Sequence, residues 1–143
     1  MPNLFQPEIA SDLDAQQRVR RWIAALRRDE YPQAASCLRT TSGFCCLGVA
    51  CDLFNDSVWR RFSGNGAEWS YLGASIALPR PVVDAYRLVS PHGHYGVESH
   101  GSGAPSSRSL ADDNDSGKTF AEIADIIEQE LEAALTTAKG DGR

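Results

Sequence analysis

The chain has 143 residues, 42% hydrophobic and 23% charged, which is enough for one globular domain with its own core. Its formal net charge of −5 argues against a nucleic-acid partner, because phosphate binding requires a basic surface. No apolar run approaches the roughly 20 residues of a membrane helix, and the first residues lack a secretion signal. We therefore expect a single domain over residues 1–143, cytoplasmic and without a membrane partner.

The N-terminal third of the sequence predicts a helix followed by a hairpin. Residues 11–29 carry apolar side chains at the helical period, with Ser11 as the expected N-cap. Pro32 prevents the helix from continuing, because proline lacks an amide donor and clashes with the preceding turn. Residues 36–40 and 44–46 are two short runs around a turn that contains glycine, which predicts a β-hairpin.

The middle of the chain has weaker patterns. Residues 47–54 place apolar side chains at the spacing of one helical face, which predicts a helix after the hairpin. A short strand is expected around residues 69–72, and Pro81 suits the first turn of a further helix. Residues 90–109 are rich in Gly, Ser, Pro and His, which predicts a long, mobile loop. The apolar face of residues 47–54 consists of Leu47, Ala50, Cys51 and Phe54.

The C-terminal helix has the clearest start. Thr119 and Glu122 have the spacing of a capping box, in which each side chain accepts the other residue's backbone amide. Residues 137–143 read as a frayed tail. The predicted fold class is therefore α+β, a small antiparallel sheet with a hairpin, packed by the N-terminal and C-terminal helices. The expected buried stripe of the last helix is Phe120, Ile123, Ile127 and Leu131.

Charges of opposite sign gather in the two terminal helices. We interpret them as two solvated helix faces that attract each other, with an anion-binding arginine face as the alternative. The arginines are Arg18, Arg20, Arg21, Arg27 and Arg28. The acidic residues are Glu122, Asp125, Glu128, Glu130 and Glu132.

The segment GFCCLGVACDLF, residues 43–54, contains three of the four cysteines. Free cysteine packs as a small apolar residue, so the favoured interpretation is that these thiols fill the core. Zinc sites usually use C-x2-4-C pairs, whereas Cys45 and Cys46 are adjacent and would point to opposite faces of a strand. We therefore expect no metal site and no cofactor.

A catalytic thiol is the enzymatic alternative. Cys45 or Cys46 would lie near a helix N-terminus, where the dipole and free amides lower the pKa of a thiol. His92, His94 or His100 could then act as the base. This arrangement would suit a cysteine-dependent hydrolase or transferase.

Arginines and aromatic residues offer a second kind of site, for a flat anionic ligand. Indole and phenol rings stack on planar groups, and arginine contributes cation–π contacts. The alternative is that the rings fill the core. The candidate ligand-binding residues are Arg39, Arg60, Arg61, Trp69, Tyr71 and His94.

Three stretches, at residues 22–31, 37–53 and 110–128, carry a family resemblance. They read W-x-x-A-L-R-x-x-x-Y, then C-L-R-x-x-x-G-F-C-C-L-G-V-x-C-D-L, then a closing segment that contains N-D-x-G-x-T-F-x-E-I-A-x-x-I-E. In this pattern the chain resembles a group of short, uncharacterised proteins of bacteriophages, prophages and actinobacterial genomes. The resemblance implies a phage context, hence the host cytoplasm, but no particular activity.

The expected function is that of a non-enzymatic, phage-type accessory binding protein in counter-defence. Such a protein would capture a host protein or sequester a small anionic, nucleotide-like signal. The alternatives are the cysteine-dependent enzyme described above and a purely structural interaction module. The latter would act as a homo-oligomer, a state with which the sequence is compatible.

Overall fold

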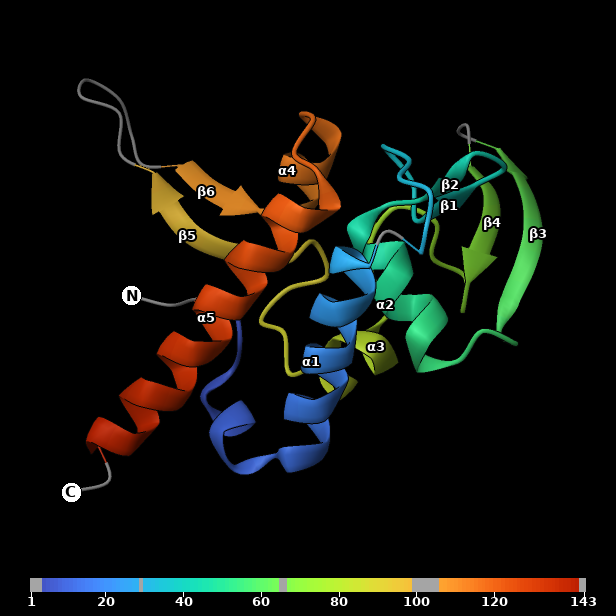
Figure 1. Ribbon diagram of the computed structural model, residues 1–143. Coiled ribbons are helices and arrows are strands. Elements are labelled where there is room, and N and C mark those ends of the chain that lie inside the picture. Colours follow the sequence, from blue (N-terminus) through green and yellow to red (C-terminus); the bar gives the residue numbers. More distant parts are fainter. Residues whose placement is uncertain (1–3, 29, 65–66, 99–105, 142–143) are drawn as a thin grey trace.

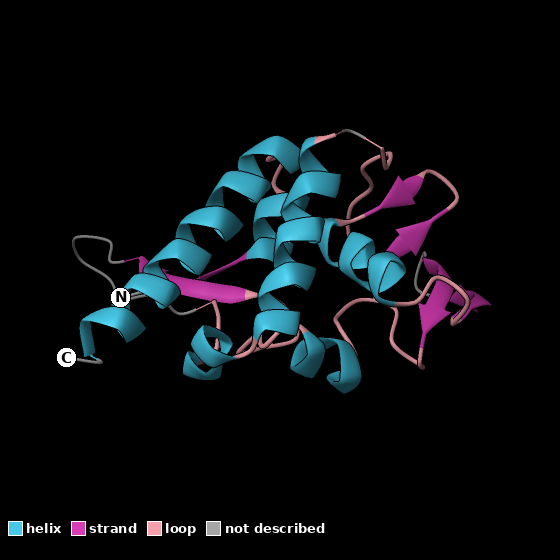
Figure 2. Ribbon diagram, turned by 60° about the horizontal axis from the view of Figure 1, so that its bottom comes forward, coloured by secondary structure: helices cyan, strands magenta, loops and turns pink. Residues whose placement is uncertain are grey.

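The protein has a helical body with strand pairs at two ends (Figure 1, Figure 2). Its two longest helices lie side by side, and the other elements pack around them. They are α1 (Leu13–Arg27) and α5 (Phe120–Asp141). Among the helices of the described ranges, none combines the length and the apolar character needed to cross a membrane. The computed structural model describes residues 4–28, 30–64, 67–98 and 106–141.

The remaining elements are short, and the described strands form antiparallel pairs rather than one sheet. The α+β class is thereby confirmed. The shorter helical segments are η1 (Pro7–Ser11), α2 (Cys46–Phe54), α3 (Arg80–Ala85) and α4 (Leu110–Asp115). The strand pairs are β1 (Arg39–Thr40) with β2 (Gly43–Phe44), β3 (Trp59–Gly64) with β4 (Ala67–Tyr71), and β5 (His94–Glu98) with β6 (Ser106–Ser109).

Helix α1 begins one residue later than the expected cap. Ser11 ends the 3₁₀ helix η1, and its hydroxyl donates to the carbonyl of Glu8. The N-cap is Asp12, whose Oδ1 accepts the Ala15 amide at 3.0 Å. Its Oδ2 accepts from Arg87 at 2.9 Å, so the backbone hydrogen bond and this ion pair hold the pKa of Asp12 below its usual range.

Two sequence expectations in the second half are corrected. The segment 90–109 is not a continuous loop, because β5 and β6 pair within it; residues 99–105 lie outside the described ranges. The turn before β5 is held by the Ser90 hydroxyl, which accepts the His94 amide at 2.9 Å. Helix α4 follows directly, and α5 continues to Asp141, through most of the stretch expected to be a frayed tail.

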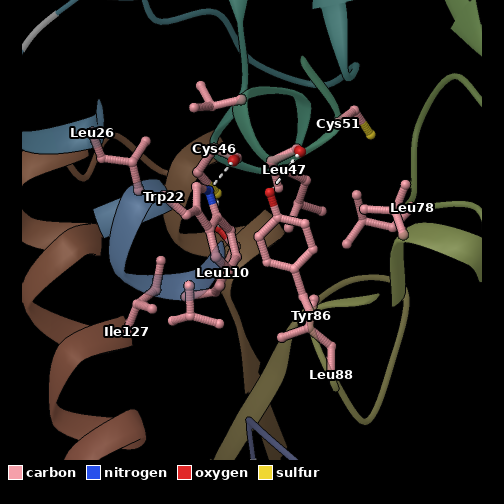
Figure 3. Close-up of a cluster of buried hydrophobic side chains, with 14 of the residues drawn as sticks. Trp22, Leu26, Cys46, Leu47, Cys51, Leu78, Tyr86, Leu88, Leu110 and Ile127 are labelled. Carbon is pink, nitrogen blue, oxygen red and sulfur yellow. Dashed lines mark hydrogen bonds between the residues drawn. The ribbon is translucent and has the colours of Figure 1, made fainter. Parts of the chain in front are cut away.

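Buried residues of α1 and α2 meet Tyr86, which follows α3, in the centre of the molecule (Figure 3). The Trp22 indole packs edge-on against Tyr86, with ring centroids 5.4 Å apart. Its Nε1 donates to the Cys46 carbonyl at 2.9 Å, and the Tyr86 hydroxyl donates to the Ala50 carbonyl at 2.9 Å. Both large rings therefore bury their apolar area without leaving a polar atom unsatisfied.

The predicted attraction between the terminal helices is confirmed. Arg27 of α1 binds Asp125 at 2.7 Å and Glu128 at 2.8 Å on α5. Arg20, two turns earlier, lies 3.5 Å from Glu132. These pairs are exposed to solvent, so they contribute little, and the apolar seam between the helices supplies most of the stability.

Candidate functional site

All four cysteines are buried, which confirms the interpretation that they fill the core. Cys45 is the N-cap of α2, and its Sγ accepts the Gly48 amide at 3.4 Å. Cys46 lies within hydrogen-bonding distance of the Leu110 carbonyl, with 3.6 Å between Sγ and oxygen. Cys51 is fully buried on the apolar face of α2, together with Leu47 and Ala50. Phe54, expected on that face as well, is 37% exposed because α2 ends there.

Burial also decides the ionisation of these thiols. Desolvation raises the pKa of Cys45 to about 12, although the Gly48 amide at the helix N-terminus acts in the opposite direction. The same cause raises the pKa of Cys46 well above its usual value. The helix N-terminus therefore does not produce a thiolate at neutral pH, and this geometry does not favour a nucleophilic role.

The candidate histidine bases have other partners. The Nδ1 atom of His94 lies 2.8 Å from the Ser90 hydroxyl, and its ring contacts His92 at 5.9 Å between centroids. Neither ring hydrogen-bonds a cysteine among the described residues, and His100 lies outside them. Within the same ranges, no group of three or more His, Cys, Asp or Glu residues is arranged to hold a metal ion.

The N-D-x-G stretch acts as a long-range connection that sequence reasoning missed. Asn114 is buried; its Oδ1 accepts the Cys46 amide at 3.2 Å and the Gln33 side chain at 2.9 Å. Its Nδ2 donates to the Ala34 carbonyl at 2.7 Å. This side chain therefore links the start of α2 to the loop after α1, whereas the neighbouring capping box of α5 is present as predicted.

Several of the predicted ligand-binding residues meet at the surface of β1 and the β3–β4 pair. The Arg39 guanidinium lies over the Trp69 ring, 4.0 Å from its centroid, and also contacts Phe44 at 4.9 Å and Trp59 at 5.3 Å. The Arg61 guanidinium lies 5.0 Å from the same Trp69 centroid. We call Arg39, Trp69 and Arg61 the arginine–tryptophan stack.

Strand register explains why these side chains meet. Arg61 pairs with Trp69 across β3 and β4, and Trp59 pairs with Tyr71 two residues away. Because side chains two apart share a face of a strand pair, the four side chains lie on one face. Arg39 reaches this face from β1, which packs against β4.

Aromatic rings support the stack from behind. Phe44, Trp59 and Tyr71 follow one another in edge-to-face contact, with 5.9 Å and 4.9 Å between successive centroids. The Trp59 indole also donates to the Asp52 carboxylate at 3.0 Å. These contacts fix the rings, so the arginines lie on a rigid surface. Phe44 was missed as a site residue; it pairs with Arg39 across the β1–β2 hairpin.

The other predicted ligand-binding residues are not part of the exposed stack. Tyr71 is fully buried, and its hydroxyl donates to the Asn55 carbonyl at 2.9 Å, so it serves as packing beneath the stack. Arg60 pairs with Ser70 and points to the opposite face of β3. His94 begins β5, at the end of the molecule away from β3 and β4 (Figure 1).

The stack carries charge that the described residues do not neutralise. Arg39 and Arg61 form no ion pair with a carboxylate in the described part of the chain, in contrast to Arg27, which has two. Two guanidinium groups are thus held against one indole ring. Such a pair repels itself and attracts an anion that both groups can reach.

Comparisons with known proteins give one match. The family model "Domain of unknown function (DUF8296)" matches residues 15–131, which include most of α1, all of α2 and the β3–β4 pair, and the first half of α5. No curated protein and no solved structure matches the chain.

Proposed function

The chain belongs to the DUF8296 family, a domain of unknown function, and we propose that it is a non-enzymatic protein that binds a small anionic, nucleotide-like ligand. The ligand binds at the arginine–tryptophan stack. One observation carries the proposal: two guanidinium groups lie within 5.0 Å of the Trp69 centroid, and no described carboxylate neutralises them.

The chemistry of the stack suits both parts of a nucleotide. A guanidinium group is a planar fork of donors that binds a phosphate through two parallel hydrogen bonds. An indole face stacks on a nucleobase, and such stacking contributes about 1–3 kcal/mol per base. Trp69 is partly exposed, while Arg61 is exposed, so ligand can reach both side chains. A ligand with phosphate and ring uses them together.

Binding without catalysis is consistent with the buried thiols. A sequestering protein needs affinity and slow release, and it needs no nucleophile beside its ligand. The resemblance in sequence adds the biological context: a phage-type accessory factor that acts in the host cytoplasm and removes a nucleotide-like signal in counter-defence. This role would require only that the stack bind more tightly than the host's own receptor.

A thermal melting scan tests the proposal. The panel contains mononucleotides, dinucleotides and cyclic dinucleotides, with inorganic phosphate as the simple anion. A ligand at 100 times its dissociation constant stabilises the native state by about 2.7 kcal/mol, which raises the melting midpoint by several degrees. We expect this rise for at least one nucleotide and a smaller one for phosphate.

Matched variants locate the binding. Arg61→Ala and Trp69→Ala should abolish the rise, whereas Arg60→Ala should keep it, because Arg60 lies on the other face of the same strand. If no nucleotide raises the midpoint of the wild-type protein, the proposal is wrong. It is equally wrong if Arg60→Ala loses the effect as completely as Arg61→Ala does.

A further inference from the structure

Helix α1 and its C-cap residue, Arg28, carry two arginine pairs with the same spacing. Arg20 and Arg27 form one pair, and Arg21 and Arg28 form the other, each seven residues apart. Seven residues correspond to about 10 Å along a helix, or two turns. The two pairs therefore form parallel rows along the helix. Because the second pair lies one residue further along the chain, the rows are about 100° apart around the helix axis.

One of these rows is already occupied by an acidic helix. Arg27 binds Asp125 and Glu128, and Arg20 lies beside Glu132, so carboxylates three and seven residues apart on α5 match the arginines. The ion pairs between α1 and α5 thus show that arginines with this spacing bind the acidic stripe of a helix that lies along α1.

The second row has no such partner in the described ranges. Arg21 and Arg28 are exposed, and neither forms an ion pair with a described carboxylate. Leu13, Gln17 and Ala24 lie on the same side of the helix, because all five positions recur at helical spacing. We call these five residues the outer face of α1.

An apolar contact point accompanies the charges. Leu13 is 69% exposed, the highest value among the large hydrophobic residues of the described chain. It lies on the outer face, in the first turn of α1. A surface hollow lies along the same helix and is lined by Asp14, Gln17, Arg18, Arg20 and Arg21. Arginine is enriched in protein interfaces, and an exposed leucine adds apolar area that a partner can cover.

We propose that the outer face of α1 is a docking surface for a protein partner that presents an acidic helix. The partner's carboxylates are spaced three or four and seven residues apart, as on α5, and an apolar residue of the partner covers Leu13. A second copy of this chain fits less well, because the acidic stripe of α5 already binds Arg20 and Arg27. The net charge of −5 disfavours nucleic acid.

Two synthetic helical peptides test the proposal. One carries glutamates at the spacing of the α5 stripe with one leucine, and the other replaces each glutamate by glutamine. Fluorescence anisotropy measures their binding to the full-length protein at 50 mM and 300 mM NaCl. We expect about fivefold tighter binding of the glutamate peptide at low salt and a smaller preference at high salt.

Variants connect the preference to the outer face. Arg21→Glu with Arg28→Glu should abolish or reverse it, and the milder Arg21→Gln with Arg28→Gln should abolish it without added repulsion. Arg60→Glu is the matched control and should keep it. A melting midpoint within a few degrees of wild type identifies the variants that are folded.

Three outcomes overturn the proposal. The first is equal binding of the two peptides, or a preference that survives both double variants. The second is a duplex DNA probe that binds through Arg21 and Arg28 while the glutamate peptide does not, which would assign the face to nucleic acid. The third is a dimer in light scattering that the same substitutions dissociate, which would assign the face to a second copy.

Discussion

The hairpin–helix junction at residues 43–54 and the arginine–tryptophan stack differ in whether their polar side chains have partners in the described part of the protein. At the junction, the sulfur atoms of Cys45 and Cys46 are buried and have hydrogen-bonding neighbours. At the stack, Arg39 and Arg61 are held against a ring without a described counter-ion. The comparison teaches that reactive residue types indicate function only where the fold leaves them accessible and uncompensated.

The junction should tolerate almost no added volume, and Gly48→Ala gives the largest expected effect. A Cβ at Gly48 would lie 1.8 Å from the Leu38 carbonyl oxygen, so backbone must move. The overpacking should cost at least about 3 kcal/mol of unfolding free energy, although alanine favours a helix by about 1 kcal/mol. Chemical denaturation measures the loss.

Gly73→Ala is the control for this prediction. Gly73 has φ +87° but no atom near its Cβ position, so only backbone strain opposes alanine there, at about 1–2 kcal/mol. A loss at Gly48 no larger than the loss at Gly73 would contradict the description of the junction as tightly sealed.

The polar connection beneath the junction comes second in size. Asn114→Ala removes the acceptor of the Cys46 amide and the donor to Ala34, and we expect a loss of about 2–3 kcal/mol. Asn114→Asp keeps the acceptor but places a buried carboxylate against the Ala34 carbonyl and beside Asp115, so at neutral pH its cost should be at least that of alanine. Urea unfolding curves for the three proteins give the order, and an alanine variant as stable as wild type would show that the connection is dispensable.

Alkaline pH should destabilise the junction through its thiols. The pKa of Cys45 is raised from 9.0 to about 12 in the folded protein. Its stabilising contribution is therefore complete below pH 9 and decreases between pH 9 and 12, by up to about 1.4 kcal/mol per pH unit. Cys45→Ser keeps an acceptor for the cap but does not titrate, so its unfolding free energy should fall less steeply over this range. Equal slopes would mean that Cys45 is not desolvated.

The smallest effect on stability is expected at the stack. Arg61→Ala removes one cation–π contact of an exposed side chain, worth about 0.5–1 kcal/mol. The variant should therefore unfold within about 1 kcal/mol of wild type while it loses ligand binding. A cost as large as that of Asn114→Ala would indicate that Arg61 serves the fold, and the contrast between the two regions would disappear.

Local sequence patterns predicted the elements whose ends are fixed by side chains close by in the sequence. The capping box of Thr119 and Glu122 is such a case, since both partners lie within one turn. The attraction of α1 and α5 was also predictable, because charge runs of opposite sign belong to the longest helices. Pairing of β5 with β6 was missed, since serines and glycines carry no alternating apolar pattern.

The candidate site depends on contacts that local patterns cannot give. Arg39 and Trp69 are separated by two strands and a helix, and only the packing of β1 against β4 brings them together. Asn114 reaches a residue 68 positions away, and the sequence around it reads as a simple turn. The types of residue were enough to predict all three members of the stack. They could not separate these three from Arg60 and Tyr71, because that distinction depends on the strand register.

The three tryptophan indoles provide the most direct test of the central claim that ligand binds on Trp69. Trp22 and Trp59 donate their indole hydrogens to Cys46 and Asp52. In a nitrogen-15 correlation spectrum assigned by single Trp→Phe variants, titration with a nucleotide that raises the melting midpoint should shift the Trp69 signal most and leave Trp22 unchanged. A nucleotide that binds while Trp69 does not move, or that shifts Trp22 first, would contradict the account.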